Sequence, residues 1–385
     1  MNVVFFDDRS DAAHGAQRTL ISLARCAQEA GHRAQVATTR TGAFTSLAAR
    51  SKVRYELLGE SSGLAVFGGE LKRPSPRSAL KALLSLVVQN WRLRALVVEA
   101  NADVLWVGNL RSMMYALLVR MTTGCTVVWY VQNLYGQRFV SELAWLIADR
   151  IIVGSSGMEG ALGAFYRWRP GKVEQLHSGV EVGVRDRQPL LAEHLAATQS
   201  GCSGCPDVKL WAIFVGSLTR EKGVHRAIEL LKNVDAERLG LLVVGERHDM
   251  DYFNLVESQA ARLPLHTHFL GFRPDADVLI GLADVLVLLS TREGLPLTVL
   301  TALRSGTVPI VTDVGGMKDA VVHGKNGVII QLQNDAPVID AWAIDVLSRA
   351  RTRQRLASNG RSGGAYWSVE AYNRRFLGIL DSIQA

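Results

Sequence analysis

Long apolar runs are missing from this 385-residue sequence. No stretch reaches 18 uncharged apolar residues, so we expect no helix that crosses a bilayer. The first eight residues, Met-Asn-Val-Val-Phe-Phe-Asp-Asp, lack the basic region and the apolar core of a signal peptide. We therefore expect a cytoplasmic protein. Cysteine is scarce, and the residues are Cys26, Cys125, Cys202 and Cys205. In the cytoplasm we expect these thiols to be reduced rather than paired in a disulfide framework.

Repeats and low-complexity segments are also missing, and the length suits two globular domains. Charge is distributed unevenly between them. Residues 1–180 hold 21 Lys+Arg and 13 Asp+Glu, a net charge of +8, whereas the remaining residues carry a net charge of −1. This excess predicts an anionic partner for the first half, such as a membrane surface, a phosphorylated acceptor or an acidic glycan. Zinc-finger spacing, RNP-type aromatic runs and DNA-reading basic helices are absent, so we expect no nucleic-acid partner.

Short apolar, β-branched runs alternate with segments of helical periodicity. The predicted strands are 3–6, 34–38, 104–107, 127–131 and 150–153, then 210–215, 239–244, 267–270, 285–289, 308–312 and 327–330. This βαβ rhythm predicts an α/β protein with two Rossmann-like, doubly wound domains facing a central cleft, where such folds bind ligands.

We place the domain boundaries where this rhythm breaks. Residues 181–208 lack a strong strand and include the run Thr-Gln-Ser-Gly-Cys-Ser-Gly-Cys-Pro, which is typical of a linker. The first domain is therefore predicted over 1–180 and the second over 209–367. The final segment, 368–385, has helical periodicity, and we expect it to cross back onto the first domain.

The segment 214–223 predicts a diphosphate clamp. A strand ends at Val215, and Gly216 permits a tight turn. Arg220 and Lys222 then lie in the loop before a helix, at the carboxyl edge of the sheet, where two cations can bind phosphate oxygens. The alternative is a loop with solvated charges.

The segment 290–303 predicts a second half of the same site. Pro296 suits the first turn of a helix, so the free amides near Leu297 and Thr298 can bind an anion. Phosphate would repel Glu293, so its expected partner is a neutral, hydroxyl-rich group. A ligand whose phosphate binds the amides and whose sugar hydroxyls bind the carboxylate is a sugar nucleotide. Alternatively, Glu293 only supports the start of the helix through the helix dipole.

A third segment, 312–322, places a Gly-Gly turn between a strand and a helix, which suits close approach to a ligand but is equally typical of an ordinary turn. In this order and spacing, the segments resemble the retaining GT-B glycosyltransferases of family GT4. The motifs that carry the resemblance are 216–223, 269–271, 293–296 and 315–316 in the second half, and 14–16 and 149–156 in the first.

The resemblance implies transfer of a hexose or amino-hexose from a nucleotide-diphosphate-sugar donor to the hydroxyl of a small, polysaccharide or lipid-linked acceptor. It implies retention of configuration without a metal or other cofactor, an acceptor-binding first domain and a donor-binding second domain. The catalytic residues would be Arg220, Lys222, Glu293 and Gln132. Donor contacts would come from Gly15, Gly216, Ser217, Phe272, Arg273, Gly294, Leu295, Pro296, Leu297, Thr298 and Thr301.

Three positions depart from the family pattern. Thr301 stands where a second glutamate usually holds the ribose, Gln132 where a histidine often contacts the donor sugar, and Ser217 where an arginine is common. These departures motivate an alternative, a catalytically silent sugar-nucleotide-binding or scaffold protein. A third hypothesis, a GT-B sugar-nucleotide epimerase, would require product without an acceptor.

Signals for other chemistries are weaker. Residues 249–251 and 275–277 match the Asp-x-Asp metal motif, but they lie in polar loops, so we expect no metal site. Cys202 and Cys205 have the spacing of half a zinc site without a second cysteine pair, which favours incidental linker thiols. Signatures of serine hydrolases, P-loop proteins and NAD enzymes are missing.

The segment 71–98 mixes cations with apolar side chains at helical spacing. Its cations are Lys72, Arg73, Arg77, Lys81, Arg92 and Arg94, and its apolar residues include Leu83, Leu84, Leu86, Val87, Val88 and Trp91. Such a helix can rest on anionic lipid, which predicts peripheral contact with the inner face of the membrane. The alternative is a core-facing helix with a solvated basic face.

Overall fold

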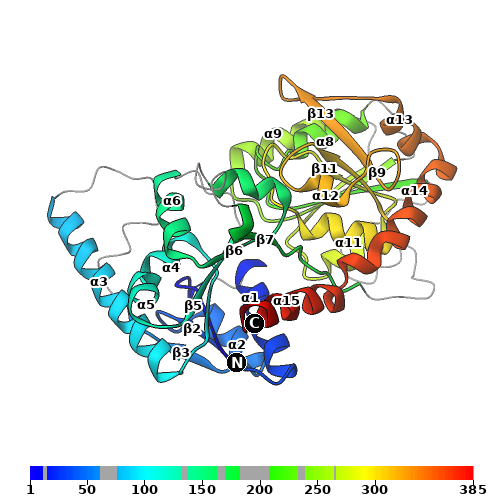
Figure 1. Cartoon of the computed structure of the whole chain (residues 1–385). Coiled ribbons are helices and arrows are strands. Elements are labelled where there is room, and N and C mark those ends of the chain that lie inside the picture. Colours follow the sequence, from blue (N-terminus) through cyan, green and yellow to red (C-terminus); the bar gives the residue numbers. More distant parts are fainter. Residues whose placement is uncertain are drawn as a thin grey trace. The chain divides into compact units, whose positions relative to one another are not determined.

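The structure is a computed structural model, and it describes residues 1–11, 15–60, 76–131, 138–162, 170–182, 208–232, 239–263 and 266–384. The chain forms two compact units (Figure 1): unit 1 is Met1–Leu176 with Asn373–Ala385, and unit 2 is His177–Tyr372. The division thus falls just before position 180, and residues 183–207 of the predicted linker lie outside the described residues. Among the described residues, no helix has the length and apolar character needed to cross a membrane.

The described strands of unit 1 form one parallel sheet with the order β3-β2-β1-β4-β5-β6-β7. They are β1 (Asn2–Phe6), β2 (Arg33–Thr38), β3 (Tyr55–Leu57), β4 (Val104–Val107), β5 (Thr126–Val131), β6 (Arg150–Val153) and β7 (Val173–Gln175). The helices are α1 (Gly15–Glu29), α2 (Ala43–Arg50), α3 (Pro76–Glu99), α4 (Leu110–Met113), η2 (Met114–Ala116), α5 (Leu117–Thr122), α6 (Arg138–Ile147), η3 (Ser156–Leu162) and η5 (Pro170–Lys172).

Unit 2 repeats this plan with the strand order β10-β9-β8-β11-β12-β13-β14, in which only the last pair is antiparallel among the described strands. The strands are β8 (Leu210–Val215), β9 (Leu239–Val244), β10 (His266–Gly271), β11 (Val285–Leu288), β12 (Val308–Thr312), β13 (Val328–Gln333) and β14 (Ala336–Val338). The helices are α8 (Val224–Leu231), α9 (Met250–Ala260), α10 (Ala276–Leu282), α11 (Leu297–Ser305), α12 (Met317–Ala320), α13 (Ala341–Ser348), α14 (Ala350–Gly363) and η7 (Gly364–Trp367). Helix α15 (Val369–Gln384) begins in unit 2 and continues into unit 1.

The predicted pair of Rossmann-like α/β domains is confirmed, and each predicted strand overlaps an observed one. Strands β4, β9 and β11 are buried at every position. Burial on both faces is normal for a parallel sheet covered by helices, and it explains why these strands read as unbroken apolar runs. The short strands β3, β7 and β14 were not predicted.

The strand order reverses beside the first strand of each sheet, between β1 and β4 and between β8 and β11. At such a switch point the connecting helices leave toward opposite faces, so a crevice opens at the carboxyl ends of the two strands. In unit 2, the segments 214–223 and 290–303 follow β8 and β11, so both predicted motifs emerge at this point.

The last helix, α15, packs its C-terminal part on unit 1. Phe376 is fully buried, with ring centroids 5.2 Å from Trp106 and 6.1 Å from Phe5. Arg150 donates to the backbone oxygen of Ser382 at 2.7 Å. The end of the chain therefore completes the core of the unit in which the chain begins.

Replacing Phe376 with alanine should destabilise unit 1 by about 3–5 kcal/mol, because a large buried ring leaves a cavity. Urea unfolding followed by tryptophan fluorescence measures this loss. The matched control is Asp381→Ala on the exposed side of the same helix, which should change stability by less than about 0.5 kcal/mol. Equal losses in the two variants would show that Phe376 is not part of the core.

Candidate functional site

The loop that follows β8 is anchored to the neighbouring strand. Gly216 donates its amide to Val244 at 2.9 Å, and Leu218, which is buried, donates to Glu246 at 2.9 Å. The glycine that this packing requires is Gly245, where a Cβ would lie 1.8 Å from the carbonyl oxygen of Gly216. Gly216 itself has room for a side chain, because its nearest neighbour, Phe214, would lie 3.7 Å away.

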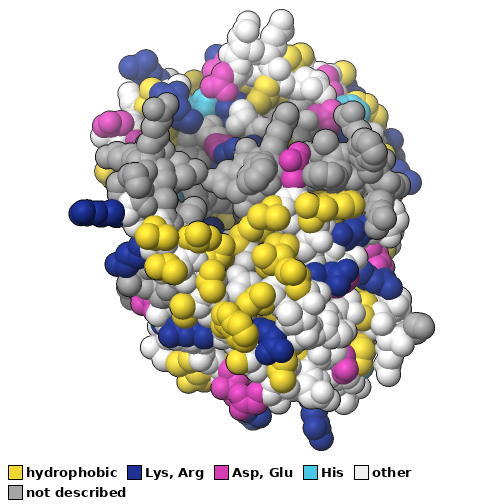
Figure 2. Space-filling model, turned by 60° about the vertical axis from the view of Figure 1, so that its left-hand side comes forward, with side chains coloured by type: hydrophobic (Ala, Val, Ile, Leu, Met, Phe, Trp, Pro, Cys, Tyr) yellow, Lys and Arg dark blue, Asp and Glu magenta, His cyan; other side chains and the backbone are white. Residues whose placement is uncertain are grey.

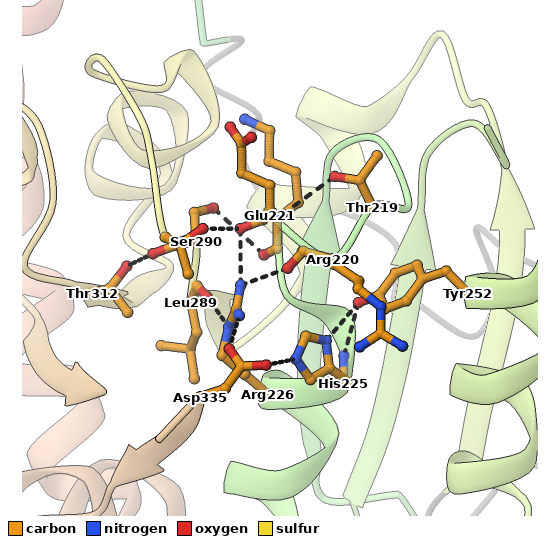
Figure 3. Close-up of polar contacts among 12 residues, drawn as sticks. Thr219, Arg220, Glu221, His225, Arg226, Tyr252, Leu289, Ser290, Thr312 and Asp335 are labelled. Atoms are coloured by element: carbon orange, nitrogen blue, oxygen red, sulfur yellow. Dashed lines mark hydrogen bonds and ion pairs between the residues drawn. The ribbon is translucent and has the colours of Figure 1, made fainter. Parts of the chain in front are cut away.

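A buried arginine at the start of α8 fixes the shape of this loop (Figure 3). Arg226 donates Nε to the carbonyl of Leu289 at 2.6 Å, and Nη2 to the carbonyls of Arg220 and Glu221 at 2.8 Å each. Its side chain is 2% exposed. Arg226 thereby ties the end of β11 to the loop that carries Arg220. We did not predict this role, although a cation within the apolar face of α8 was a signal for it.

The anionic partner of Arg226 comes from the β13–β14 hairpin. Asn334 and Asp335 form the two-residue turn with φ values of 51° and 64°, as in a type I′ turn. Asp335 pairs with Arg226 and lies 3.2 Å from Nε2 of His225. Burial opposes ionisation of Asp335, but hydrogen bonds from Arg226 and His225 outweigh it and hold its pKa below the ordinary value. Burial lowers the pKa of His225, whose Nδ1 lies 2.7 Å from the Tyr252 hydroxyl.

An ion pair joins the two predicted motifs. Lys222 Nζ lies 2.7 Å from Oε1 of Glu293, and the same oxygen accepts a hydrogen bond from Ser290 Oγ at 2.7 Å. Glu293 is 8% exposed. Its other oxygen, Oε2, has no hydrogen-bond partner in the part of the chain that the structure describes. Lys222 therefore neutralises a carboxylate that keeps one oxygen available.

The two loops also meet through a second set of contacts. Thr291 donates its amide to the carbonyl of Glu221 at 2.9 Å, and Arg292 pairs with the Glu221 carboxylate at 2.8 Å. Arg220 is exposed, and its guanidinium lies 5.8 Å from the ring centroid of Tyr252 (Figure 3). Of the two predicted cations, Arg220 is thus the one directed to solvent.

Helix α11 begins at Leu297, so Pro296 precedes it as the N-cap with extended backbone, one position before the predicted first turn. The first helical hydrogen bond in this segment runs from the Val299 amide to the Pro296 carbonyl at 3.1 Å, so the amides of Leu297 and Thr298 precede it. Thr298 Oγ1 is buried without a hydrogen-bond partner among the described residues. Thr301 is 6% exposed on the same helix. The start of α11 therefore combines open donors with an unsatisfied hydroxyl.

The Gly-Gly turn packs on the chain itself. Gly315 has a φ of 56°, and a Cβ there would lie 2.0 Å from the carbonyl oxygen of Glu293. Gly316 donates its amide to the carbonyl of Gly294 at 2.6 Å. The close approach that these glycines permit is to the backbone beside Glu293, so no ligand is needed to explain them.

A hollow of about 530 Å³ lies beside the ends of β9 and β10, lined by residues 245–248 and 269–272. Phe272, a predicted donor contact, lines it and is 65% exposed. Arg273, also predicted, instead forms a bidentate pair with Asp275 at 2.7 and 2.6 Å. Asp249 caps α9 by accepting from the Tyr252 amide at 2.9 Å. Within the described ranges, no three His, Cys, Asp or Glu residues are placed to hold a metal.

Unit 1 carries a buried carboxylate pair at its own switch point. Asp7 and Asp8 directly follow β1, and both accept hydrogen bonds from Nδ2 of Asn109, at 2.8 and 3.0 Å. Asp8 also pairs with Arg111. Burial, with the neighbouring charge of Asp8, raises the pKa of Asp7 to about 7. We did not predict this pair, although two aspartates at the end of a buried strand were a signal for it.

Other predicted residues of unit 1 are less informative. Gly15 is the first residue of α1, and a Cβ there would meet nothing within 4 Å. Gln132, His14 and the cysteines at 202 and 205 lie outside the described residues.

Two family models match successive parts of the chain. The model for Glycosyltransferase Family 4 matches residues 13–184, and the model for Glycosyl transferases group 1 matches residues 203–363. The chain belongs to the family 4 glycosyltransferases. The resemblance inferred from the motifs is thereby confirmed.

Individual family members are distant. An uncharacterized glycosyltransferase of Methanocaldococcus jannaschii is 27% identical over 55% of this chain and 54% of its own length. Glycogen synthase of Mycobacterium tuberculosis is 30% identical over 41% of this chain and 40% of its own. The chain thus spans about half the length of the curated relatives it matches, or less. HepE of Anabaena in complex with UDP aligns with a TM-score of 0.80 at 19% identity, covering 99% of this chain and 100% of its own. This likeness shows the GT-B fold.

The family motifs 216–223, 293–296 and 315–316 therefore converge on one region of unit 2, and Arg226, Ser290 and Asp335 support them from outside the motifs. Of the departures from the family pattern, Thr301 is buried in α11 and Ser217 lies in the loop after β8.

Replacing Arg226 with methionine should destabilise unit 2 by about 2–3 kcal/mol, because it leaves carbonyls at 220, 221 and 289 without their donor. Asp335→Asn removes only the ion pair, and the Asp335 side chain is 56% exposed. That control should therefore cost less than about 1 kcal/mol. Chemical unfolding of the two variants measures the difference. Equal losses would mean that the ion pair, rather than the carbonyl contacts, holds the loop.

The buried Asp7 should make unit 1 less stable as the pH rises from about 4 to 7. Over this range the Asp7 carboxyl loses its proton in the unfolded chain but keeps it in the folded chain. Because the folded state binds more protons, the free energy of unfolding falls as the pH rises. Unfolding free energies of the wild type and Asp7→Asn, measured at pH 4.5 and 7, test this. The wild type should lose more stability across the interval than the variant, and parallel profiles would refute the assignment.

Proposed function

We propose that the chain transfers a hexose from a nucleotide diphosphate sugar to an acceptor hydroxyl with retention of configuration. The donor would bind to unit 2, at the loops after β8 and β11. The observation that supports this best is the Lys222–Glu293 pair beside the start of α11. A free carboxylate there would repel a diphosphate, whereas a carboxylate neutralised at 2.7 Å can lie next to one.

In this proposal the donor divides between two kinds of contact. The diphosphate takes the amides of Leu297 and Thr298, the Thr298 hydroxyl and the exposed guanidinium of Arg220. The sugar hydroxyls take Oε2 of Glu293. Phe272 offers an exposed ring at the hollow beside β9 and β10, where an aromatic base can stack.

The proposed transfer needs no protein nucleophile. The acceptor oxygen forms a bond to the anomeric carbon on the face from which the diphosphate leaves, while the bond between that carbon and the phosphate oxygen breaks. The departing phosphate accepts the acceptor's proton. Arg220 and the amides of α11 stabilise the charge that develops on the leaving group. Such preorganised donors commonly lower the activation free energy by roughly several kcal/mol.

A uridine nucleotide is the first donor to test, since the related HepE has been solved with UDP and with UDP-glucose. The acceptor class is proposed as a small molecule, a polysaccharide or a lipid-linked sugar, bound by unit 1. The second candidate is a catalytically silent sugar-nucleotide-binding protein, which Thr301 favours because threonine lacks the carboxylate that usually holds the ribose.

The test measures nucleotide release from a panel of sugar nucleotides with mixed acceptors, and UDP binding by calorimetry. Glu293→Gln should lower turnover by about 100-fold or more, because it weakens positioning of the transferred sugar, while UDP, which lacks that sugar, still binds. Arg220→Met should weaken UDP binding about tenfold. The matched control is Arg292→Ala, an exposed neighbour paired with Glu221, which should change neither quantity by much.

Three outcomes would contradict the proposal. Donor binding without release from any donor would support the silent binder. An altered sugar nucleotide formed without acceptor would support an epimerase. Product with inverted configuration would exclude the same-face transfer.

A further inference from the structure

Helix α3 carries apolar side chains on two sides, because Leu93 and Val97 are buried in the core while a second apolar face is exposed. Its buried positions include Ser85, Gln89 and Asn90, which are 7%, 0% and 5% exposed. Its exposed positions include Leu84 and Trp91, which are 59% and 60% exposed. Helices of soluble domains normally turn their apolar stripe toward the core. The helix therefore presents to its surroundings a second apolar face, where a surface helix ordinarily carries polar residues.

Specific hydrogen bonds fix this orientation. Gln89 Nε2 donates to the carbonyl of Gly59 at 2.9 Å, and Asn90 Nδ2 donates to the carbonyl of Met114 at 2.8 Å. Asn90 Oδ1 accepts the amide of Leu118 at 3.0 Å. Turning the apolar stripe inward would break these bonds and leave the backbone groups of Gly59, Met114 and Leu118 without their partners, which is costly. The outward apolar face is thus built into the packing of unit 1.

The exposed apolar residues form a continuous stripe along the helix. Leu80, Leu84, Trp91 and Val98 are separated by four and seven residues, which places them on one side at 100° per residue. The other members of the stripe are Leu83, Val87 and Val88.

Neighbouring helices extend this surface. Helix α5 packs beside α3, where Arg94 Nε donates to Thr122 Oγ1 at 2.7 Å. It adds Leu117 and Met121, which are 40% and 71% exposed. Figure 2 shows hydrophobic side chains gathered on the side of the molecule where α3, α5 and α6 lie, with Lys and Arg side chains beside them. An apolar surface on several elements marks an interaction site rather than a scatter of exposed residues.

Charge identifies the kind of partner. Helix α3 carries Arg77, Lys81, Arg92 and Arg94, and its only acidic residue is Glu99, at its last position. At 100° per residue, Lys81 and Arg92 lie along one edge of the apolar stripe. Trp91, with Arg94 5.7 Å from its ring, has the mixed apolar and polar character of a residue at a membrane interface.

We propose that the α3–α5 face, defined by the exposed apolar residues of α3 and α5 with the α3 cations, docks on the surface of an anionic lipid bilayer. The apolar stripe enters the acyl boundary, and the cations contact the headgroups. A second copy of the chain fits less well, because a two-fold contact would place the same cations against each other. This docking is independent of the proposed transfer reaction and would bring unit 1 to lipid-linked acceptors.

Vesicle flotation tests this proposal without any activity measurement. The full chain is mixed with vesicles of phosphatidylcholine alone or with 30% phosphatidylglycerol. We expect strong recovery only with the anionic vesicles. Lys81→Gln should lower the partition coefficient for anionic vesicles about fivefold, the loss expected for one basic residue near the surface. Leu84→Ser with Trp91→Ser should lower it more than tenfold.

The matched control is Leu255→Ser, which removes a leucine that is 38% exposed in unit 2 and should float like the wild type. Circular dichroism checks that each variant is folded, which is expected because the altered side chains are exposed. Equal recovery of the wild type from neutral and anionic vesicles would overturn the proposal. The proposal would also be overturned if the Leu84/Trp91 variant floated with anionic vesicles as well as the wild type does. If sedimentation velocity showed that the wild type is a dimer and that this variant is a monomer, the face would instead be assigned to self-association.

Discussion

The buried guanidinium of Arg226 is the contact on which the candidate site depends. It donates to carbonyls in the loop after β8 and at the end of β11, and so holds together the two chain segments that leave the sheet at its switch point. With this tie in place, Lys222 reaches Glu293, and Glu221 meets residues 291 and 292. Removing it would weaken the contact between these two segments, because the carbonyls of Arg220, Glu221 and Leu289 would lose their donor.

The sequence places the acidic Glu293 next to a predicted anion site, which would be unfavourable if its carboxylate were free. The structure pairs that carboxylate with a cation. Acid and phosphate repel each other unless a cation intervenes, and Lys222 is that cation. The cost is that Lys222 is committed to Glu293, which leaves Arg220 and the amides of α11 as the main phosphate ligands of the proposal. The cation pair predicted as a simple clamp thus divides into two roles.

The sequence predicted the fold well because buried parallel strands appear as uninterrupted apolar runs, and it placed the motif loops at strand ends. It could not predict which atoms the charged residues contact. Arg226 lies one turn beyond the motif, and its partners are backbone carbonyls, which have no sequence signature. Asp335 is distant in the chain and is brought near by a hairpin. The glycines at 315 and 316 looked suited to a ligand, but Gly315 packs against the backbone of Glu293, and Gly316 donates its amide to Gly294. In α3, composition revealed an amphipathic helix, but only the hydrogen bonds of Gln89 and Asn90 show which face is outward.

A crystal structure of the chain with bound UDP tests the central claim most directly, because it locates the diphosphate without requiring turnover. We expect phosphate oxygens within hydrogen-bonding distance of the amides of Leu297 and Thr298, with Arg220 turned toward them and the Lys222–Glu293 pair intact. A diphosphate bound elsewhere, with the start of α11 vacant, would contradict it.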